Sequence, residues 1–358
     1  MYPSQRVMAI ASIATLMTIT TACGAPKAPD SATDNPTYFT VATANGVGQP
    51  GAAQIAEFVR QVERFSPDGS IKIDTQLKAA GDETEAWNQA VLQLVEAGDV
   101  DMALIPTRTW EGEGVTSFSA LSAPFLVTND DVLKQVVAPA FAEPMLAGLE
   151  PVGLTGLALL PEGQRHLFSF GEPIDEPGDL VGKVVRAPES AITDEVLESF
   201  GAVPQPLPGN LFTQALADNT VDATETSFAR AGGLTKPTTV TGNLVLYPKI
   251  NTLVINRGLW NGLSDDERRT IEQAADATRA WATAAMPSTA GEAAAYCQRG
   301  GTIFTAPAEG IAEFKAAVAP AIARLEKDPA TKALMAKIRA LTASTPAPAP
   351  LTPCSPAK

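Results

Sequence analysis

Residues that commonly carry metal or nucleophilic catalysis are scarce in this chain. It contains one histidine, His166, and three cysteines among 358 residues. No group of His and Cys residues has the spacing of a metal site. The patterns of serine hydrolases, zinc peptidases and P-loop proteins are absent. The sequence therefore predicts a protein that is not an enzyme and needs no cofactor.

Basic residues are also few, because 26 Lys and Arg stand against 40 Asp and Glu, giving a formal net charge of −14 at pH 7. Nucleic acids and anionic membrane surfaces require a basic footprint, so neither is an expected partner. A small anionic ligand remains compatible with this charge, because a cleft can be locally positive inside an acidic protein.

The N-terminus has the order of a bacterial lipoprotein signal. Arg6 precedes an apolar stretch, residues 7–20, and Cys23 follows closely. The stretch is too short for a convincing membrane-spanning helix. We expect residues 1–22 to be a signal peptide and residues 23–36 a flexible Pro-rich tether. Cys23 would carry the lipid that anchors the protein to the extracytoplasmic face of the cell membrane. An ordinary signal peptide followed by a free cysteine is the alternative.

Two cysteines remain, Cys297 and Cys354. In an oxidising compartment they can pair. Closing a loop of this length would stabilise the fold by roughly 4 kcal/mol in the chain-entropy model. We predict this disulfide, which would tie the Pro-rich tail, residues 342–358, to the body. Two unpaired thiols are the alternative.

The chain is long enough for two domains, because a single core stops growing at about 250–300 residues. Its first part alternates strand and helix patterns, which predicts a mostly parallel sheet. A second alternation follows and indicates a separate lobe. The expected strands are 38–44, 70–77, 100–106, 151–160, 183–187, 221–225 and two within 243–256, around Pro248. The expected helices are 52–65, 84–97, 191–200, 211–219, 264–285, 308–327 and 332–341. Ser264 and Glu267 form a capping-box pattern, and Pro287 predicts a break.

Arg186 occupies a position where ligands commonly bind. It follows the strand-forming residues 183–185, and Pro188 should end that strand close by. In open α/β sheets, ligands bind outside the carboxyl ends of strands. A guanidinium at this place offers a rigid pair of donors to a carboxylate. The alternative is an arginine that simply reaches solvent.

Several different short motifs follow one another along the chain in a defined order. They are VEAGDVDMALIP (95–106), APFLV (123–127), GQR (163–165), LVGKVVRAP (180–188), GAVP (201–204), LADNTVDATE (216–225) and INRGLWNGL (255–263). Together they closely resemble the substrate-binding proteins of TRAP transporters, the DctP-type family, over residues 37–341. The resemblance implies an α/β, two-lobe, type II periplasmic-binding-protein-like fold with a hinge and a long C-terminal helix. Lobe I would comprise 37–162 with 251–290, and lobe II 163–250 with 291–341.

The same resemblance implies a ligand-binding site between the lobes. Arg186 would grip a ligand carboxylate, Arg165 would help, and Thr226 stands where many relatives carry a ligand-bonding asparagine. Further candidate contacts are Asn45, Asn251, Thr107 and Trp110, the last two at the rim of the first lobe. Pro106 replaces a glutamate of sialic-acid-binding relatives, so sialic acid is not expected.

The function implied is an extracytoplasmic receptor for a small organic acid, which works with TRAP-type membrane subunits. A sensory subunit that reports the ligand to a signalling partner is one alternative. An enzyme on the same scaffold is another, and the scarcity of catalytic groups argues against it.

Overall fold

The computed structural model describes residues 36–81 and 84–355. The expected signal peptide, nearly all of the tether and the lipidation site at Cys23 lie outside these ranges. Within them, no helix combines the length and the apolar character needed to cross a membrane.

Nine strands of the described chain form one mixed sheet, in the order β2-β1-β3-β8-β4-β7-β5-β6, with β9 paired to β8. The strands are β1 Thr37–Thr43, β2 Ile71–Leu77, β3 Met102–Pro106, β4 Leu154–Ser169, β5 Val184–Ala187, β6 Val203–Pro206, β7 Ala223–Thr226, β8 Thr239–Asn256 and β9 Thr302–Phe304. Neighbours are parallel within β1–β3 and within β5–β7, as the alternating pattern predicts. The long strand β8 runs antiparallel to both β3 and β4.

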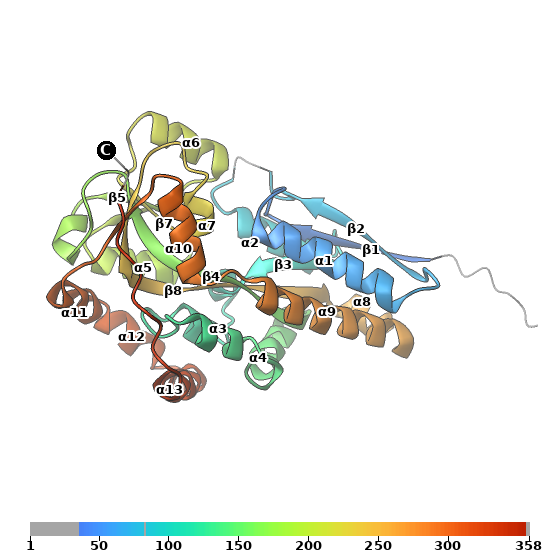
Figure 1. Ribbon diagram of the computed structural model, residues 1–358. Coiled ribbons are helices and arrows are strands. Elements are labelled where there is room, and N and C mark those ends of the chain that lie inside the picture. The colour runs from blue at the N-terminus through green and yellow to red at the C-terminus, as the bar shows by residue number, and fades with distance from the viewer. Residues whose placement is uncertain (1–35, 82–83, 356–358) are drawn as a thin grey trace, which may run out of the picture. The chain divides into compact units, whose positions relative to one another are not determined.

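Helices cover both faces of this sheet (Figure 1). They are α1 Pro50–Phe65, α2 Trp87–Ala97, α3 Asp130–Val136, α4 Pro139–Leu146, α5 Ala191–Ser199, α6 Gly209–Ala217, α7 Phe228–Ala231, α8 Arg257–Gly262, α9 Asp265–Ala285, α10 Thr289–Gln298, α11 Ala308–Ala317, α12 Ala319–Leu325 and α13 Pro329–Ser344. Short 3-10 helices are η1 Thr107–Glu113, η2 Ser119–Ser122, η3 Ala147–Val152 and η4 Pro177–Leu180. Figure 1 shows α1 and α9 side by side against the part of the sheet built from β1 to β3.

Two strands differ from the sequence prediction. β4 does not stop near Gly163 but continues to Ser169, and β8 runs unbroken through Pro248 instead of forming two strands. Pro248 lies opposite Gln164, between two register shifts of the β4–β8 ladder. A residue without an N–H is tolerated at such an irregularity, because the regular hydrogen bonding is already interrupted there.

Proline explains the other differences. Residues 201–210 lie outside the strands and helices expected from the sequence, yet Val203–Pro206 forms β6, which pairs with β5 and ends the sheet of the described residues. Edge strands accept proline because their outer side needs no donor. The expected helix 308–327 is split into α11 and α12 next to Pro320. The capping box of Ser264 and the break at Pro287 are confirmed.

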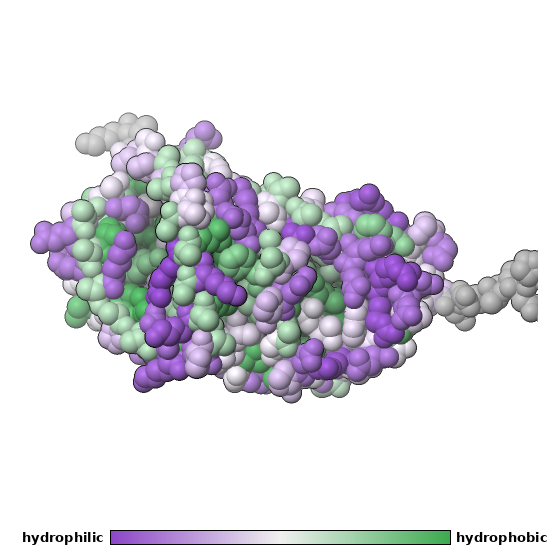
Figure 2. Space-filling model, turned by 90° about the horizontal axis from the view of Figure 1, so that it is seen from below, coloured by the Kyte–Doolittle hydropathy of each residue, from purple (hydrophilic) through white to green (hydrophobic). Residues whose placement is uncertain are grey.

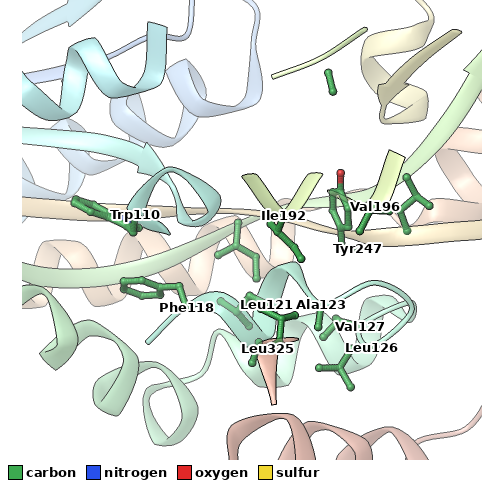
Figure 3. Close-up of a cluster of buried hydrophobic side chains, with 14 of the residues drawn as sticks. Trp110, Phe118, Leu121, Ala123, Leu126, Val127, Ile192, Val196, Tyr247 and Leu325 are labelled. Carbon is green, nitrogen blue, oxygen red and sulfur yellow. The ribbon is translucent and has the colours of Figure 1, made fainter. Parts of the chain in front are cut away.

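The largest hydrophobic cluster joins segments far apart in the sequence. Figure 3 shows Trp110 of η1, Ile192 of α5, Tyr247 of β8 and Leu325 of α12 within one group of buried side chains. The face drawn in Figure 2 carries scattered hydrophobic residues among hydrophilic ones, as is usual for a protein surface. Among the described residues, this cluster therefore extends beneath both parts of the sheet, and three smaller clusters accompany it.

Candidate ligand-binding site

A cavity of about 150 Å³ opens where strands of both parts of the sheet end. One water needs roughly 10–15 Å³ measured in this way, so the space admits a small molecule. Its walls are Ala44, Asn45, Gly46, Gln49, Lys78, Gly81, Trp87, Asn88, Pro106, Arg108, Arg165, Arg186, Pro188, Pro208, Gly209, Arg230 and Lys249. Several of these residues directly follow β1, β5 and β6, which is the expected place for a ligand in an α/β sheet.

Six of the lining side chains are cationic: Lys78, Arg108, Arg165, Arg186, Arg230 and Lys249. Among residues 36–81 and 84–355, no carboxylate lines the cavity. The protein as a whole is strongly acidic. The cavity is therefore locally positive, in the way that the sequence analysis left open for an anionic ligand.

Arg186 is held in a defined orientation. Its Nε and Nη2 both donate to the carbonyl oxygen of Leu207, at 3.0 and 2.9 Å. The guanidinium carbon lies 5.4 Å from the ring centroid of Trp87 and 4.9 Å from that of Phe212, which permits cation–π attraction to both rings. Burial, with a contribution from Arg230, lowers the pKa of Arg186 to about 9, so the group stays charged at neutral pH.

Glu225 lies behind the cavity between two arginines. Its carboxylate oxygens are 3.6 Å from Nε of Arg165 and 3.8 Å from Nη1 of Arg108, and Glu225 is fully buried. Neither oxygen accepts a hydrogen bond from a described residue. The carboxylate of Glu225 thus interacts with two guanidinium groups and helps to hold both in place. Its single negative charge cannot neutralise both positive charges.

A second buried ion pair joins β4 to β8. Nζ of Lys249 lies 2.7 Å from Oε1 of Glu162, and Nδ2 of Asn251 donates to the same oxygen at 2.6 Å. Burial acts to raise the pKa of Glu162, but Lys249 and Arg165 outweigh it and lower that pKa to about 2. Burial lowers the pKa of Lys249 to about 7; Glu162 opposes this change, while Arg165 and Arg230 add to it.

The structure brings three of the seven predicted contact residues together at this cavity: Asn45, Arg165 and Arg186. Thr226 stands one step back, where its hydroxyl accepts from Nη1 of Arg165 at 3.4 Å. Asn251 is fully buried and bonds to Glu162 and Gln54. These residues can position the cavity wall, and direct contact with a ligand stays a prediction for all seven.

Trp110 and Thr107 are not at the rim. η1 begins directly after β3 and turns Trp110 into the core, where its Nε1 donates to the hydroxyl of Thr252 at 2.8 Å. Thr107 is buried and lines a separate small hollow. The sequence alone placed both at the rim of the first lobe, because nothing in TRTW signals a 3-10 turn.

The sequence analysis did not single out Lys249 and Arg230 as site residues. Lys249 is the one charged residue in the run 243–256, which otherwise consists of apolar and neutral polar residues. A lysine in a buried strand needs an ionic partner or a function, so its position could have identified it as a site residue. Arg230 lies on the short helix α7, a few residues after the motif 216–225, and no local pattern marks it.

One further prediction concerns Cys297 and Cys354. The structure joins the two cysteines in a disulfide with Cα atoms 6.0 Å apart, and Cys354 exchanges backbone hydrogen bonds with Ile303.

His166 is fully buried against Phe228, with ring centroids 4.8 Å apart. Burial lowers the pKa of His166 to about 4, so it is a neutral packing residue at pH 7. Within the described residues, no group of three His, Cys, Asp or Glu could hold a metal ion.

Known proteins share this architecture. The family model of the bacterial extracellular solute-binding protein, family 7 (DctP), matches residues 55–328. The chain belongs to this family. The predicted family and the two-lobe fold class are therefore confirmed.

Curated members are distant relatives of this family 7 protein. The C4-dicarboxylate-binding periplasmic protein DctP of Rhodobacter capsulatus is 26% identical over 230 residues, 63% of this chain and 65% of that protein. The ectoine-binding periplasmic protein TeaA of Halomonas elongata is 29% identical over 130 residues, 35% of this chain and 37% of TeaA. The chain thus spans just under two thirds, or less, of these relatives.

Solved structures agree over a larger share of the chain. A TRAP periplasmic solute-binding protein from Roseobacter denitrificans, with bound β-D-glucuronate, has a TM-score of 0.73 at 20% identity and covers 85% of this chain and 99% of its own. The sugar acid binding protein DctPAm from Advenella mimigardefordensis, in complex with galactonate, has a TM-score of 0.73 at 20% identity, with coverages of 85% and 98%. At these identities the similarity establishes the fold.

Proposed function

We propose that this protein is the extracytoplasmic solute receptor of a TRAP-type transporter, which binds a small organic acid through its carboxylate and closes around it. The observation that carries the proposal is Arg186. Its guanidinium lines the cavity, and in the described chain it pairs with no carboxylate. Its remaining N–H groups are available to a ligand in the paired geometry that suits a carboxylate.

Closure follows from where the lining residues originate. Asn45 and Trp87 belong to the segments around β1 and α2, whereas Arg186 and Arg230 belong to those around β5 and α7. A ligand that contacts both groups stabilises the closed arrangement more than the open one, and so shifts the population toward it. Removing a carboxylate from water is costly unless it is paired, which the cationic wall provides.

The lobe boundaries belong to this proposal. Lobe I would comprise residues 37–162 with 251–290, and lobe II residues 163–250 with 291–341. The hinge would then lie where β4 and β8 pass from one lobe to the other. Register shifts on either side of Gly163 support this position, because the ladder there is already irregular.

The partner subunits and the cellular location are also part of this proposal. The partners would be the TRAP-type membrane subunits, and the receptor would be held at the extracytoplasmic face by lipid at Cys23. DctP-type relatives of the periplasm support an extracytoplasmic location. The lipid anchor depends on the signal pattern of the N-terminal sequence alone.

A thermal-shift screen against a library of organic acids tests the proposal. A ligand at 100 times its Kd should add about 2.7 kcal/mol of stability, which is readily seen as a rise in Tm. Calorimetry should then give a stoichiometry of one per chain, and the ligand should be recovered unchanged. If no organic acid raises the Tm, or if the bound acid is turned over, the proposal fails.

A further inference from the structure

The end of the tail is fastened to the body close to elements that form the ligand cavity. Cys354 is joined by the disulfide to Cys297, which lies in the last turn of α10. It also exchanges two backbone hydrogen bonds with Ile303 of β9. Leu351 and both cysteines pack on one hydrophobic cluster, which we call the tail cluster. Its buried members are Phe168, Phe228, Ala231, Val240, Ala293, Tyr296 and Ile303.

The short helix α7 depends on the tail cluster for its position. It has four residues, and the side chain of its N-cap residue, Ser227, makes no capping hydrogen bond. A single helical turn is not stable by itself, so contacts with other elements must hold it in place. Its first and last residues, Phe228 and Ala231, are both buried in the tail cluster. A change in this cluster should therefore displace α7.

Helix α10 connects α7 to the disulfide. The ring centroid of Tyr296 lies 5.5 Å from that of Phe228. A Cβ atom on Gly232, directly after α7, would lie 2.5 Å from Nη2 of Arg299, so the guanidinium of Arg299 packs against the backbone there. Tyr296 and Arg299 stand on either side of Cys297 in the sequence. The disulfide therefore fastens the part of α10 that contacts α7.

Helix α7 in turn supplies part of the cavity wall. Arg230, its third residue, lines the cavity. Phe228 also packs on His166, with ring centroids 4.8 Å apart, and His166 directly follows the cavity residue Arg165 on β4. Hydrogen bonds between a guanidinium and an anion are short and directional. A small displacement of α7 would therefore weaken the hold of the cavity on an acid.

We propose that the disulfide between Cys297 and Cys354 keeps α7 in its binding position, so that reduction of this bond weakens ligand binding. This inference rests on the proposed function, because it concerns the affinity of the same cavity. A dithiol reductant supplies two electrons and two protons: the S–S bond breaks, each sulfur becomes a thiol, and the dithiol is oxidised to a disulfide. The receptor then binds its acid tightly in an oxidising compartment and weakly where thiols stay reduced.

Amide hydrogen exchange tests the position of α7 without any ligand. The full chain carrying Cys23→Ala, in which only Cys297 and Cys354 remain, is compared before and after treatment with a dithiol. We expect exchange in residues 226–234 to become about tenfold faster on reduction, because a weakly held element opens locally. Unchanged exchange in this segment would refute the inference.

Calorimetry measures the effect on affinity. D-glucuronate, galactonate and succinate are titrated, and the acid that binds most tightly to the oxidised protein is the probe. Reduction should raise its Kd about three- to thirtyfold, part of what the complete loss of a charged hydrogen bond would cost. Cys354→Ser should give the same rise and make binding insensitive to the dithiol.

A matched control separates positioning from a general loss of stability. Ile271 is fully buried on α9 in a different cluster, so Ile271→Ala should lower the Tm to a similar extent as loss of the disulfide. Far below its Tm this variant should keep the original Kd within about twofold, and its α7 should exchange at the original rate.

The outcomes distinguish this inference from the function on which it rests. If the probe acid binds equally well to the oxidised and the reduced protein, or if Ile271→Ala weakens binding as much as reduction does, the positioning role is refuted while the receptor function stands. If no acid of this panel or of the wider library binds, the receptor function and the change in affinity fail together.

Discussion

Replacing Arg186 by lysine should weaken ligand binding strongly while leaving the fold in place. The arginine uses one edge of its guanidinium on the Leu207 carbonyl and has other N–H groups left for a ligand. A lysine ammonium can satisfy either the carbonyl or the ligand in good geometry, but it has no rigid fork for both. One charged hydrogen bond to the ligand is lost, which is worth about 1.5–3 kcal/mol.

The aromatic neighbours add to this loss. The ring centroids of Trp87 and Phe212 lie 5.4 and 4.9 Å from the guanidinium carbon. Such contacts contribute about 0.5–1 kcal/mol each at exposed sites. These contributions add up to about 2.5–5 kcal/mol. We therefore expect Arg186→Lys to raise Kd by about 60- to 4,000-fold, since 1.4 kcal/mol corresponds to a factor of ten.

Isothermal titration of the ligand found by the acid screen measures the change directly. Thermal unfolding without ligand is the control, and the Tm should move by only a few degrees because Arg186 pairs with no described carboxylate. An affinity within threefold of the original would show that Arg186 does not hold the ligand. A collapse of the Tm would show instead that the fork is mainly structural.

The other predictions address the cavity, the tail and the anchor. Trp87→Leu should raise Kd about three- to fivefold by loosening Arg186, and an unchanged Kd would remove the aromatic contact from the site. Burial, together with the charges of Arg165 and Arg230, lowers the pKa of Lys249 to about 7, while Glu162 opposes the change. Because Lys249 loses its positive charge as pH rises from 6 to 8.5, affinity for the acid ligand should fall over that range. Lys249→Met should flatten that profile, and a profile equally steep in the variant would contradict it. Protein beginning at residue 36, unfolded without reductant, should show no free thiol, and Cys354→Ser should lower stability by about 2–4 kcal/mol; two titratable thiols would exclude the disulfide. Cys23→Ala should release the protein from the membrane fraction, and continued membrane attachment would exclude the lipid anchor.

Local signals predicted much of the fold because they act within a few residues. Ser264 and Glu267 satisfy each other's backbone at the start of α9, and Gly98 adopts the left-handed conformation that ends α2. Such features depend on neighbouring residues and so are legible in the sequence. Pro248 shows the limit: a local rule places a break there, but pairing with the bulged part of β4 allows the strand to continue.

The candidate site was less predictable because it is built from residues that are far apart in the sequence and meet only in the folded protein. Arg165 and Arg186 could be found from ordered motifs, yet their contacts with Glu225 and Leu207 come from distant segments. Lys249 and Glu162 become meaningful only when β4 and β8 are paired. Conversely, Trp110 was expected at the rim of the first lobe because the turn that buries it has no local signature.

The two edge strands of the sheet disfavour strand pairing with a second molecule of the protein. In β6, Val203 donates its amide hydrogen inward to Lys183, while Pro204 and Pro206 have none to offer outward. At the opposite end, β2 presents Lys72 and Asp74 to solvent. A strand from a second molecule would find no backbone N–H donors at the two prolines of β6 and charged side chains on β2. Crowding of many copies of this protein should therefore not drive them to polymerise through their sheets.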